Sequence, residues 1–474
     1  MLSVAGQAHA QVPADQPPPV QPAPVQPAPP PTDPNAGVTP VDGSSTVQLP
    51  PPPSEQLREN DPLQAKIADM IRKEMGAVPK LLEFHGYLRA GISQNDKGGD
   101  ADAFQAPGAY SKFRLGNEVE TYGEIGLDSN WINPDHNDTW FKTSVKLAVV
   151  APRDSTFDTL NAIAIREAYA QAGHVIPSEP EMTFWAGQRF YRRRDSHIID
   201  FFYQDMSGYG AGFEDLKVGE KAKIAVAYLG GSREYNMGDP MSDVGRLYKS
   251  TIDLRLYDVP AGKGSLEFWL IPSVGTSGSL GDAANNHNGM GGGVFYFLPM
   301  LGGFNELSAE YGYAGSADFS TSADPTPSDG WMFRVVDRAV LQLTPNMSMM
   351  ASGVFQLDNR DGNPTGTTDS SAGNMWVSVG ARPVYNFTKY TGIAVEGGVD
   401  IVKPETEGSS TGVLGKLTIA PLIRPGMDFW ARPELRAFVT MATWSNSIKG
   451  QVGGAAFAND TFGLTAGVQM ESWW

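Results

Sequence analysis

Aromatic and charged side chains recur two residues apart at four places in this chain. The pairs are Tyr87 with Arg89, Tyr122 with Glu124, Trp430 with Arg432, and Trp473 with Glu471. If these segments are β-strands, both members of a pair lie on the same face of the sheet. Each pair then offers a flat apolar ring beside a charged hydrogen-bonding group. This combination suits the binding of a ligand that has apolar faces and a polar rim.

The last thirteen residues indicate a strand with two chemically different faces. One set of alternate positions is mostly apolar and consists of Phe462, Leu464, Ala466, Val468, Met470, Ser472 and Trp474. The other set is mostly small or polar and consists of Gly463, Thr465, Gly467, Gln469, Glu471 and Trp473. This alternation predicts lipid on one side and a water-filled lumen on the other, as in a transmembrane β-barrel.

Aromatic residues on barrel strands usually lie in the girdles at the two membrane interfaces. The charged partners argue against that placement for Tyr87, Tyr122, Trp430 and Trp473. A basic residue that faces lipid near mid-membrane costs roughly 2–4 kcal/mol, so the face that carries Arg89 is expected to face water. The four aromatic residues are therefore predicted to line the lumen.

The composition restricts the class of protein. The 474 residues are 41% hydrophobic, the mean hydropathy is −0.27, and the chain has no Cys. We find no run of about 18 consecutive apolar residues, so spanning helices are not expected, whereas a β-barrel is compatible because its apolar residues occupy every second position. The net charge of −17 argues against nucleic-acid binding, which requires a basic surface. The six His lack metal-ligand spacing, and neither a metal nor another cofactor is predicted.

Four segments are predicted along the chain. Residues 1–10 end in Ala-x-Ala and are interpreted as the remnant of a signal peptide. Residues 11–53 form a Pro-rich linker, and residues 54–78 form a periplasmic helix that is either a short coiled coil or a lone amphipathic helix. From residue 83 to residue 474, strands alternate with Gly-, Asn-, Asp-, Ser- and Thr-rich loops. Their spacing predicts an all-β transmembrane antiparallel barrel of about 18 strands.

Eight blocks of the sequence resemble the maltoporin family of sugar-specific outer-membrane porins. The blocks are Phe84 to Arg89, Ser111 to Glu118, Glu120 to Tyr122, Trp185 to Tyr191, Asp195 to Asp200, Ser207 to Gly212, Trp430 to Pro433, and Gln469 to Trp474. They occur in the family's order and extend from about residue 83 to the end of the chain. The resemblance implies an eighteen-stranded antiparallel barrel in the outer membrane of a Gram-negative cell. It also implies a homotrimer and a channel rather than an enzyme.

The resemblance further implies which residues bind the sugar. The aromatic path would consist of Tyr87, Tyr122, Phe157, Phe304, Trp430 and Trp473, with Phe157 reaching the channel mouth of a neighbouring subunit. The ionic residues beside the path would be Arg89, Arg114, Glu124, Arg166, Arg193, Asp195 and Asp200. The charged segment from Arg192 to Asp205 would fold inward and narrow the lumen, although in an arbitrary protein it would be a solvated loop.

Several positions depart from the family pattern. Phe202 stands where the best-known members have a Tyr beside the constriction, which removes a hydroxyl, and Phe157 stands where they have a Trp. Ala103 and Val119 correspond to two first-loop cysteines, so the disulfide between them cannot form.

The expected function is facilitated diffusion of maltodextrin-like or other oligosaccharides. Aromatic rings can stack on the flat C–H faces of a pyranose while charged side chains bind its hydroxyl rim. The alternatives are a general porin without sugar specificity and a secreted β-protein that binds or hydrolyses glycans. The lipid-facing alternation of the last strand disfavours the secreted protein. The expected partners are the oligosaccharide, outer-membrane lipid, further copies of the chain in the homotrimer, and a periplasmic partner of the N-terminal extension.

Overall fold

The structure of the protein, a computed structural model, describes residues 81–133, 136, 138–151, 162–235, 245–276, 288–323, 328–359, 374–404 and 409–474. The segments predicted at 1–10, 11–53 and 54–78 lie outside these residues, as does Phe157. Their proposed roles therefore stay predictions.

Strands make up most of the regular structure. In chain order they are β1 (Leu82–Asn95), β2 (Thr121–Ile132), β3 (Trp140–Ala151), β4 (Ala162–Gly173), β5 (Thr183–Arg189), β6 (Arg194–Ser196), β7 (Phe201–Gln204), β8 (Gly208–Val218), β9 (Ala222–Tyr235), β10 (Gly245–Ala261), β11 (Gly264–Thr276), β12 (Gly289–Met300), β13 (Gly303–Ala314), β14 (Trp331–Thr344), β15 (Met347–Asn359), β16 (Asn374–Asn386), β17 (Thr391–Pro404), β18 (Gly412–Ile423), β19 (Glu434–Trp444) and β20 (Phe462–Trp473). Short 3-10 helices lie in connections, namely η1 (His197–Ile199), η3 (Asn446–Ile448) and η4 (Ala455–Phe457). Within the described ranges, no helix is long and apolar enough to cross a membrane.

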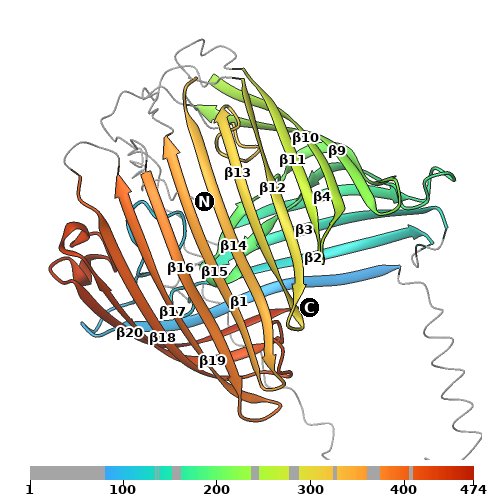
Figure 1. Ribbon diagram of the computed structural model, residues 1–474. Coiled ribbons are helices and arrows are strands. Elements are labelled where there is room, and N and C mark those ends of the chain that lie inside the picture. Colours follow the sequence, from blue (N-terminus) through green and yellow to red (C-terminus); the bar gives the residue numbers. More distant parts are fainter. Residues whose placement is uncertain are drawn as a thin grey trace, which may run out of the picture. The chain divides into compact units, whose positions relative to one another are not determined.

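Eighteen of the strands form one closed antiparallel barrel wall (Figure 1). Neighbouring strands along the chain pair with one another, and β1 also pairs with β20, where Tyr87 lies opposite Trp473. This last pairing closes the sheet, so the wall has no free edge. The strands β6 and β7 form a separate hairpin in the connection between β5 and β8. The prediction of an antiparallel barrel of about 18 strands is confirmed.

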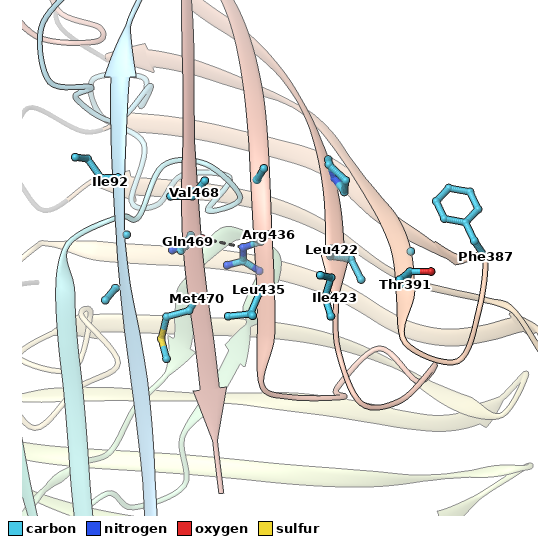
Figure 2. Close-up of a pocket in the computed structure, with 15 residues that line it drawn as sticks. Ile92, Phe387, Thr391, Leu422, Ile423, Leu435, Arg436, Val468, Gln469 and Met470 are labelled. Atoms are coloured by element: carbon cyan, nitrogen blue, oxygen red, sulfur yellow. Dashed lines mark hydrogen bonds between the residues drawn. The ribbon is translucent and has the colours of Figure 1, made fainter.

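The last strand has the two faces that its sequence predicts. Val468 is 54% exposed on the outer face of β20, whereas its neighbour Gln469 is 5% exposed and faces inward. Gln469 accepts a hydrogen bond from Arg436 Nε of β19 at 2.8 Å. Figure 2 shows this buried pair among the apolar side chains of the outer wall, such as Leu435 and Met470, which line a shallow groove.

The connection between β1 and β2, residues 96–120, folds against the inner wall. Phe113 packs so closely onto Gly380 of β16 and Gly398 of β17 that a β-carbon at either glycine would overlap its ring. A larger residue at either glycine would displace Phe113, because closely packed interiors leave little room for extra atoms. The sequence analysis did not predict this inward fold.

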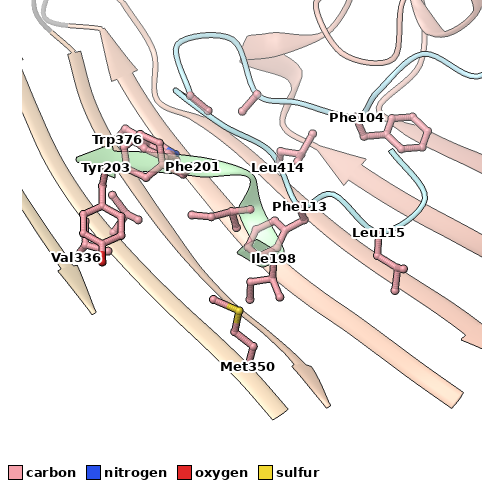
Figure 3. Packing of buried hydrophobic residues seen from close by; sticks show 14 of the residues in the cluster. Phe104, Phe113, Leu115, Ile198, Phe201, Tyr203, Val336, Met350, Trp376 and Leu414 are labelled. Carbon is pink, nitrogen blue, oxygen red and sulfur yellow. The ribbon is translucent and has the colours of Figure 1, made fainter. Parts of the chain in front are cut away.

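The connection between β5 and β8, residues 190–207, also lies inside the barrel. Phe201 packs edge-on against Trp376 of β16, with ring centroids 5.0 Å apart. Figure 3 shows side chains of both inward connections gathered over the strands of the wall. This placement agrees with the inward fold expected for the segment from Arg192 to Asp205.

Two strand boundaries differ from the predicted alternation. Alternation of polar and apolar residues from Glu118 to Gly126 predicts that Glu118 and Val119 lie on opposite faces of one strand, but β2 begins at Thr121 and both residues are buried in the preceding connection. The pattern also places Trp430 on a strand, but β19 begins at Glu434, so Trp430 lies in the connection between β18 and β19. Alternation along a sequence can continue through a connection, whereas strand pairing does not.

Asp337 interrupts an apolar series on the outer face of β14. Trp331, Phe333 and Val335 precede it at alternate positions, and Ala339 and Leu341 follow it. Its side chain is exposed and contacts Asn305 of β13. We expect Asp337→Val to raise the free energy of unfolding in lipid vesicles by on the order of 1 kcal/mol, less than the cost of a basic residue at this depth. Urea unfolding in vesicles measures this change.

The control for this prediction is Val335→Asp, which adds a second carboxylate to the same outer face and should lower the free energy of unfolding. Equal or lower stability of Asp337→Val would contradict a lipid-facing position for Asp337.

Candidate functional site: an aromatic row on the inner wall

Four aromatic side chains form a continuous row inside the barrel. The ring centroid of Tyr122 on β2 lies 6.0 Å from that of Tyr87 on β1. Tyr87 lies 6.5 Å from Trp473 on β20, with the ring planes 14° apart. Trp473 in turn lies 6.1 Å from Trp430. The structure therefore brings together four of the six aromatic residues that the sequence analysis selected.

The register of three neighbouring strands places three of these rings, namely Tyr122, Tyr87 and Trp473. Tyr87 lies opposite Trp473 on one side and opposite Glu124 on the other, and Arg89 lies opposite Tyr122. Residues directly opposite one another in an antiparallel pair project to the same face. The hydroxyl of Tyr122 donates a hydrogen bond to Glu124 Oε1 at 2.5 Å. Aromatic and charged residues are thus neighbours across the strands as well as along them.

Arginines lie against two rings of the row. The guanidinium carbon of Arg89 is 5.2 Å from the ring centroid of Tyr122, and that of Arg432 is 4.1 Å from the ring of Trp473. A cation over an aromatic face is attracted by the ring quadrupole. These contacts help to fix the orientation of the rings.

Glu471 connects the charged groups behind the row. Its carboxylate accepts hydrogen bonds from the Tyr87 hydroxyl at 2.9 Å, from Arg114 Nη2 at 3.0 Å and from Arg432 Nη2 at 3.0 Å. Arg436 contacts the same carboxylate at 3.5 Å. A buried carboxylate is stable in its charged form when it has such partners. The sequence analysis noted Glu471 beside Trp473 but did not select it as a site residue. Its partners come from distant segments of the chain, so no local sequence pattern indicates that they meet at this carboxylate.

Arg89 and Arg114 belong to the same network. Arg114 Nε donates to Glu118 Oε2 at 2.9 Å, and Arg89 Nη1 lies 3.0 Å from the same carboxylate. Arg89 also pairs with Glu120. The first inward connection therefore supplies an arginine and two carboxylates that surround one end of the aromatic row.

The wall holds Arg114 in place through the backbone of the next residue. The N–H of Leu115 donates to Glu396 Oε1 at 2.9 Å, and its carbonyl accepts from Lys416 Nζ at 2.5 Å and from Thr418 Oγ1 at 3.1 Å. All four residues are buried. Because the wall binds both the N–H and the carbonyl of Leu115, the backbone next to Arg114 is held in one position.

His197 was not predicted as a site residue, yet it lies on the row. Its ring centroid is 5.4 Å from Trp430 and 5.8 Å from Trp473, edge-on in both cases. Its Nδ1 lies 3.0 Å from Arg114 Nη1, which can only donate, so Nδ1 accepts. The sequence analysis gave all six His ordinary polar roles. Its position within the resembling block from Asp195 to Asp200 is the signal that would have selected it.

A second cluster surrounds Phe190, which the sequence analysis also missed. The guanidinium carbons of Arg193 and Arg166 lie 4.1 Å and 5.1 Å from its ring centroid, and Lys146 Nζ lies 4.9 Å away. Arg193 lies 4.0 Å from the ring of Phe202, which is exposed. Two predicted residues, Arg166 and Arg193, therefore lie against an aromatic residue that was not predicted, and Arg193 links it to the predicted residue Phe202.

Phe304 does not join the row. It lies on β13, and its ring stacks on Phe297 of β12 with the centroids 5.4 Å apart. Asp195 also lies away from the row, where its carbonyl accepts a hydrogen bond from Arg338 Nη1 at 2.6 Å. Phe157 lies outside the described residues, so its place in the path stays a prediction.

Two residues of the inward connection have shifted acidities. Burial, together with the nearby carboxylate of Glu118, raises the pKa of Asp200 to about 6, although Arg114 at 4.0 Å opposes the shift. Burial and the positive charge of Arg114 lower the pKa of His197 well below its usual range. Glu118 keeps a lowered pKa despite its burial, because Arg114 and Arg89 are close. Near neutral pH, Asp200 is therefore the group among these that changes charge.

We expect the cation preference of the ion current to rise as the pH increases through about 6. Below this pH Asp200 is neutral, and above it a negative charge appears in the lumen. A raised pKa also means that the stability that Asp200 contributes is present at low pH and lost as the pH rises through about 6. Reversal potentials across a salt gradient, measured from about pH 5 to about pH 7, report the change in selectivity.

Asp200→Asn should abolish this step, whereas His197 stays neutral throughout the range and should contribute nothing. An equal step in the Asp200→Asn channel would assign the titration to another group.

The chain is similar in sequence to one described family and in structure to several porins. The sequence model of the LamB porin family matches residues 82–474. A Salmonella typhi OmpF structure in complex with daunomycin is 11% identical, covers 83% of this chain and 97% of that chain, and has a TM-score of 0.43. Pseudomonas aeruginosa OccD3 (OpdP) and OccK10 (OpdN) are each 9% identical, with TM-scores of 0.42, and cover 83% of this chain and 91% and 99% of their own.

The family match begins at the first residue of β1, extends to the end of the chain, and includes every strand of the closed wall. Among the described residues, no group of three or more His, Cys, Asp or Glu side chains is arranged to hold a metal ion. On the strength of the family match, the chain belongs to the LamB porin family and forms an outer-membrane channel.

Proposed function

We propose that the channel is selective for oligosaccharides and carries them by facilitated diffusion. The observation that supports this most directly is the unbroken row of Tyr122, Tyr87, Trp473 and Trp430, in which neighbouring ring centroids are 6.0–6.5 Å apart. A pyranose offers flat C–H faces to such rings, and its hydroxyls can bond to the charged groups alongside.

The spacing of the rings suits movement as well as binding. A pore must bind its substrate strongly enough to favour entry and weakly enough to permit exit. With one ring following another, a sugar exchanges one stacking contact for the next and is never fully released. The substrate therefore crosses without a single deep binding site that would trap it.

The charges beside the row are paired in a way that favours a neutral substrate. Glu471 faces Arg114 and Arg432, and Glu118 faces Arg114 and Arg89. Opposite charges this close give strong local hydrogen-bonding groups but little net field. The match to the LamB porin family supports a channel rather than a glycan hydrolase.

The proposal extends to the assembly and to the N-terminal extension. We infer that the chain forms a homotrimer, that residues 11–53 are a periplasmic spacer, and that residues 54–78 form a helix that either self-associates or tethers the barrel to a periplasmic partner. The support is the sequence: clustered prolines favour an extended chain, and apolar residues recur at steps of three and four in the helix.

Trp473→Ala and Trp430→Ala should weaken block of the ion current by a linear oligosaccharide far more than they change the open-channel conductance. Each variant removes a stacking surface but no charge. Stacking of bases on aromatic residues is worth about 1–3 kcal/mol, and a loss of that order raises the dissociation constant about tenfold. Planar-bilayer recordings with a titrated panel of oligosaccharides measure both quantities.

Trp444→Ala is a matched control, because Trp444 is buried beside Phe104 and Phe457 at the opposite end of β19 from Trp430. If no sugar of the panel blocks the current of the unmodified channel, the protein is a general porin without sugar specificity. Unchanged sugar affinity in both Trp473→Ala and Trp430→Ala would refute the aromatic path.

Deletion of residues 11–78 should leave sugar block nearly unchanged, because the deleted segment precedes β1. If the helix self-associates, the deletion lowers the temperature at which the detergent-solubilised trimer dissociates, since three tethered helices meet at high local concentration. Gel mobility after heating is compared with bilayer block for both proteins. Loss of sugar block in the truncated channel would contradict the proposal that the extension takes no part in sugar binding. An unchanged dissociation temperature of the trimer would contradict self-association of the helix and leave tethering to a periplasmic partner as its role.

A further inference from the structure

The hairpin formed by β6 and β7 has one buried face and one exposed face. Phe201 and Tyr203 of β7 are 6% and 1% exposed, whereas Phe202 between them is 41% exposed. Alternate side chains of a strand point to opposite faces, so β7 turns Phe202 away from the surface that its two neighbours cover. Across the hairpin, Phe202 lies opposite Asp195 of β6. The groups that hold this hairpin therefore decide where these two predicted site residues lie.

Arg334 of β14 holds the β7 side of the hairpin. Its Nη1 donates to the carbonyl of Tyr203 at 2.6 Å, and its Nε donates to Gln356 Oε1 of β15 at 2.7 Å. Its guanidinium carbon lies 5.0 Å from the ring centroid of Phe201 and 5.0 Å from that of Phe319, in the connection between β13 and β14. A planar guanidinium with several N–H donors can serve these partners at once. One side chain thus joins the hairpin to the wall and to a further connection.

Arg338 of the same strand holds the β6 side of the hairpin. It projects from the same face of β14 as Arg334, because the two positions belong to the same alternate set. Its Nη1 donates to the carbonyl of Asp195 at 2.6 Å, and its Nη2 lies 3.3 Å from Glu306 Oε1 of β13. The hydroxyl of Tyr203 donates to the same carboxylate oxygen. The two arginines therefore bind one backbone carbonyl on each strand of the hairpin.

The positive charges of both arginines are balanced within the wall. Arg334 lies 3.5 Å from Glu310, and Arg338 lies 3.3 Å from Glu306, both on β13. A buried guanidinium is costly unless it is paired and hydrogen-bonded. With a carboxylate beside each arginine, further N–H groups are free to bind the hairpin. Because they bind main-chain carbonyls, they fix the course of the backbone and not only one side chain.

We propose that Arg334 and Arg338 are positioning residues that hold the β6–β7 hairpin against the wall and so set how far Phe202 projects into the channel. The inference needs only the channel itself, whereas its consequence for sugar block rests on the proposed selectivity. Loss of either arginine releases one strand of the hairpin, and the width of the passage beside Phe202 then fluctuates. A fluctuating passage gives a noisier ion current and shorter contacts with a bound sugar.

Arg338→Gln in the full-length channel tests this role, because Glu306 keeps the Tyr203 hydroxyl and Arg194 Nη1, at 3.7 Å, as partners and the barrel should still fold. Amide hydrogen exchange of residues 190–207 should become about tenfold faster or more, since exchange reports local opening, whereas β1 and β20 keep native exchange. Planar-bilayer recordings should show higher open-channel noise and faster dissociation of a linear α-linked glucose hexamer. Arg338→Lys keeps a positively charged donor and should restore slow exchange and low noise.

Arg334→Gln combined with Glu310→Gln is the second variant. The pair of changes removes the arginine without leaving the buried Glu310 carboxylate unpaired, and it should give the same faster exchange and higher noise.

Arg424→Gln is the matched control for hydrogen exchange. Arg424 is 2% exposed, as buried as Arg334 at 5%, but its side chain donates to Asn386 Oδ1 and to the carbonyl of Met427, which lie outside the hairpin. Its loss should leave the exchange of residues 190–207 native.

Native exchange and native noise in either test variant would overturn the role of that arginine. Equally fast exchange in Arg424→Gln would assign the effect to a general loss of barrel stability and also overturn it. Faster exchange without a change in noise would refute the claim that the hairpin sets the width of the passage. Exchange and noise are measured without sugar, so they decide this inference even where the sugar panel refutes the proposed selectivity.

Discussion

The rest of the structure depends on one constraint: every strand of a closed wall between lipid and water must pair with two neighbours and must send alternate side chains to opposite environments. Closure pairs β1 with β20, and this same pairing sets Tyr87 against Trp473. A shift of one residue in that register would turn the whole inner face of a strand toward lipid. Barrel closure therefore places Tyr87 beside Trp473, whereas Trp430 joins the row from the connection between β18 and β19.

Charges inside the barrel would be expensive if they were alone. Glu471 and Glu118 are buried, but arginines from the wall and from the first inward connection surround both. Removing one partner of a buried pair typically costs about 3–5 kcal/mol, so these ion pairs help to hold the first inward connection against the wall. The network thereby links stability to function, because the groups that anchor the connection also border the rings.

The two inward connections divide the interior. They form a buried hydrophobic cluster with strands of the wall, in which Phe113, Phe201 and Trp376 take part, and they leave the rings on β1, β2 and β20 half-buried. Close packing of this kind fixes side chains in single positions. The aromatic row is thus bordered on one side by strands and on the other by connections that pack like a domain core.

The sequence by itself determined the antiparallel barrel, its strand number of about 18, and the inward direction of Tyr87, Tyr122 and Trp473. The reason is that apolar and polar residues alternate along each strand, since alternate side chains face lipid and water, and that strands and loops follow one another at a regular spacing. The resemblance to the maltoporin family added Phe157, Phe304 and the ionic residues other than Arg89 and Glu124. Only the tertiary structure decided that residues 96–120 fold inside, that Trp430 lies in a connection, that Glu471 and His197 lie against the aromatic row, and that Phe190 packs against Arg193. These facts depend on contacts between segments up to several hundred residues apart, such as Arg114 with Glu471. The periodicity of a single segment cannot predict such a contact, because the contact depends on the strand register and on the closure of the whole wall.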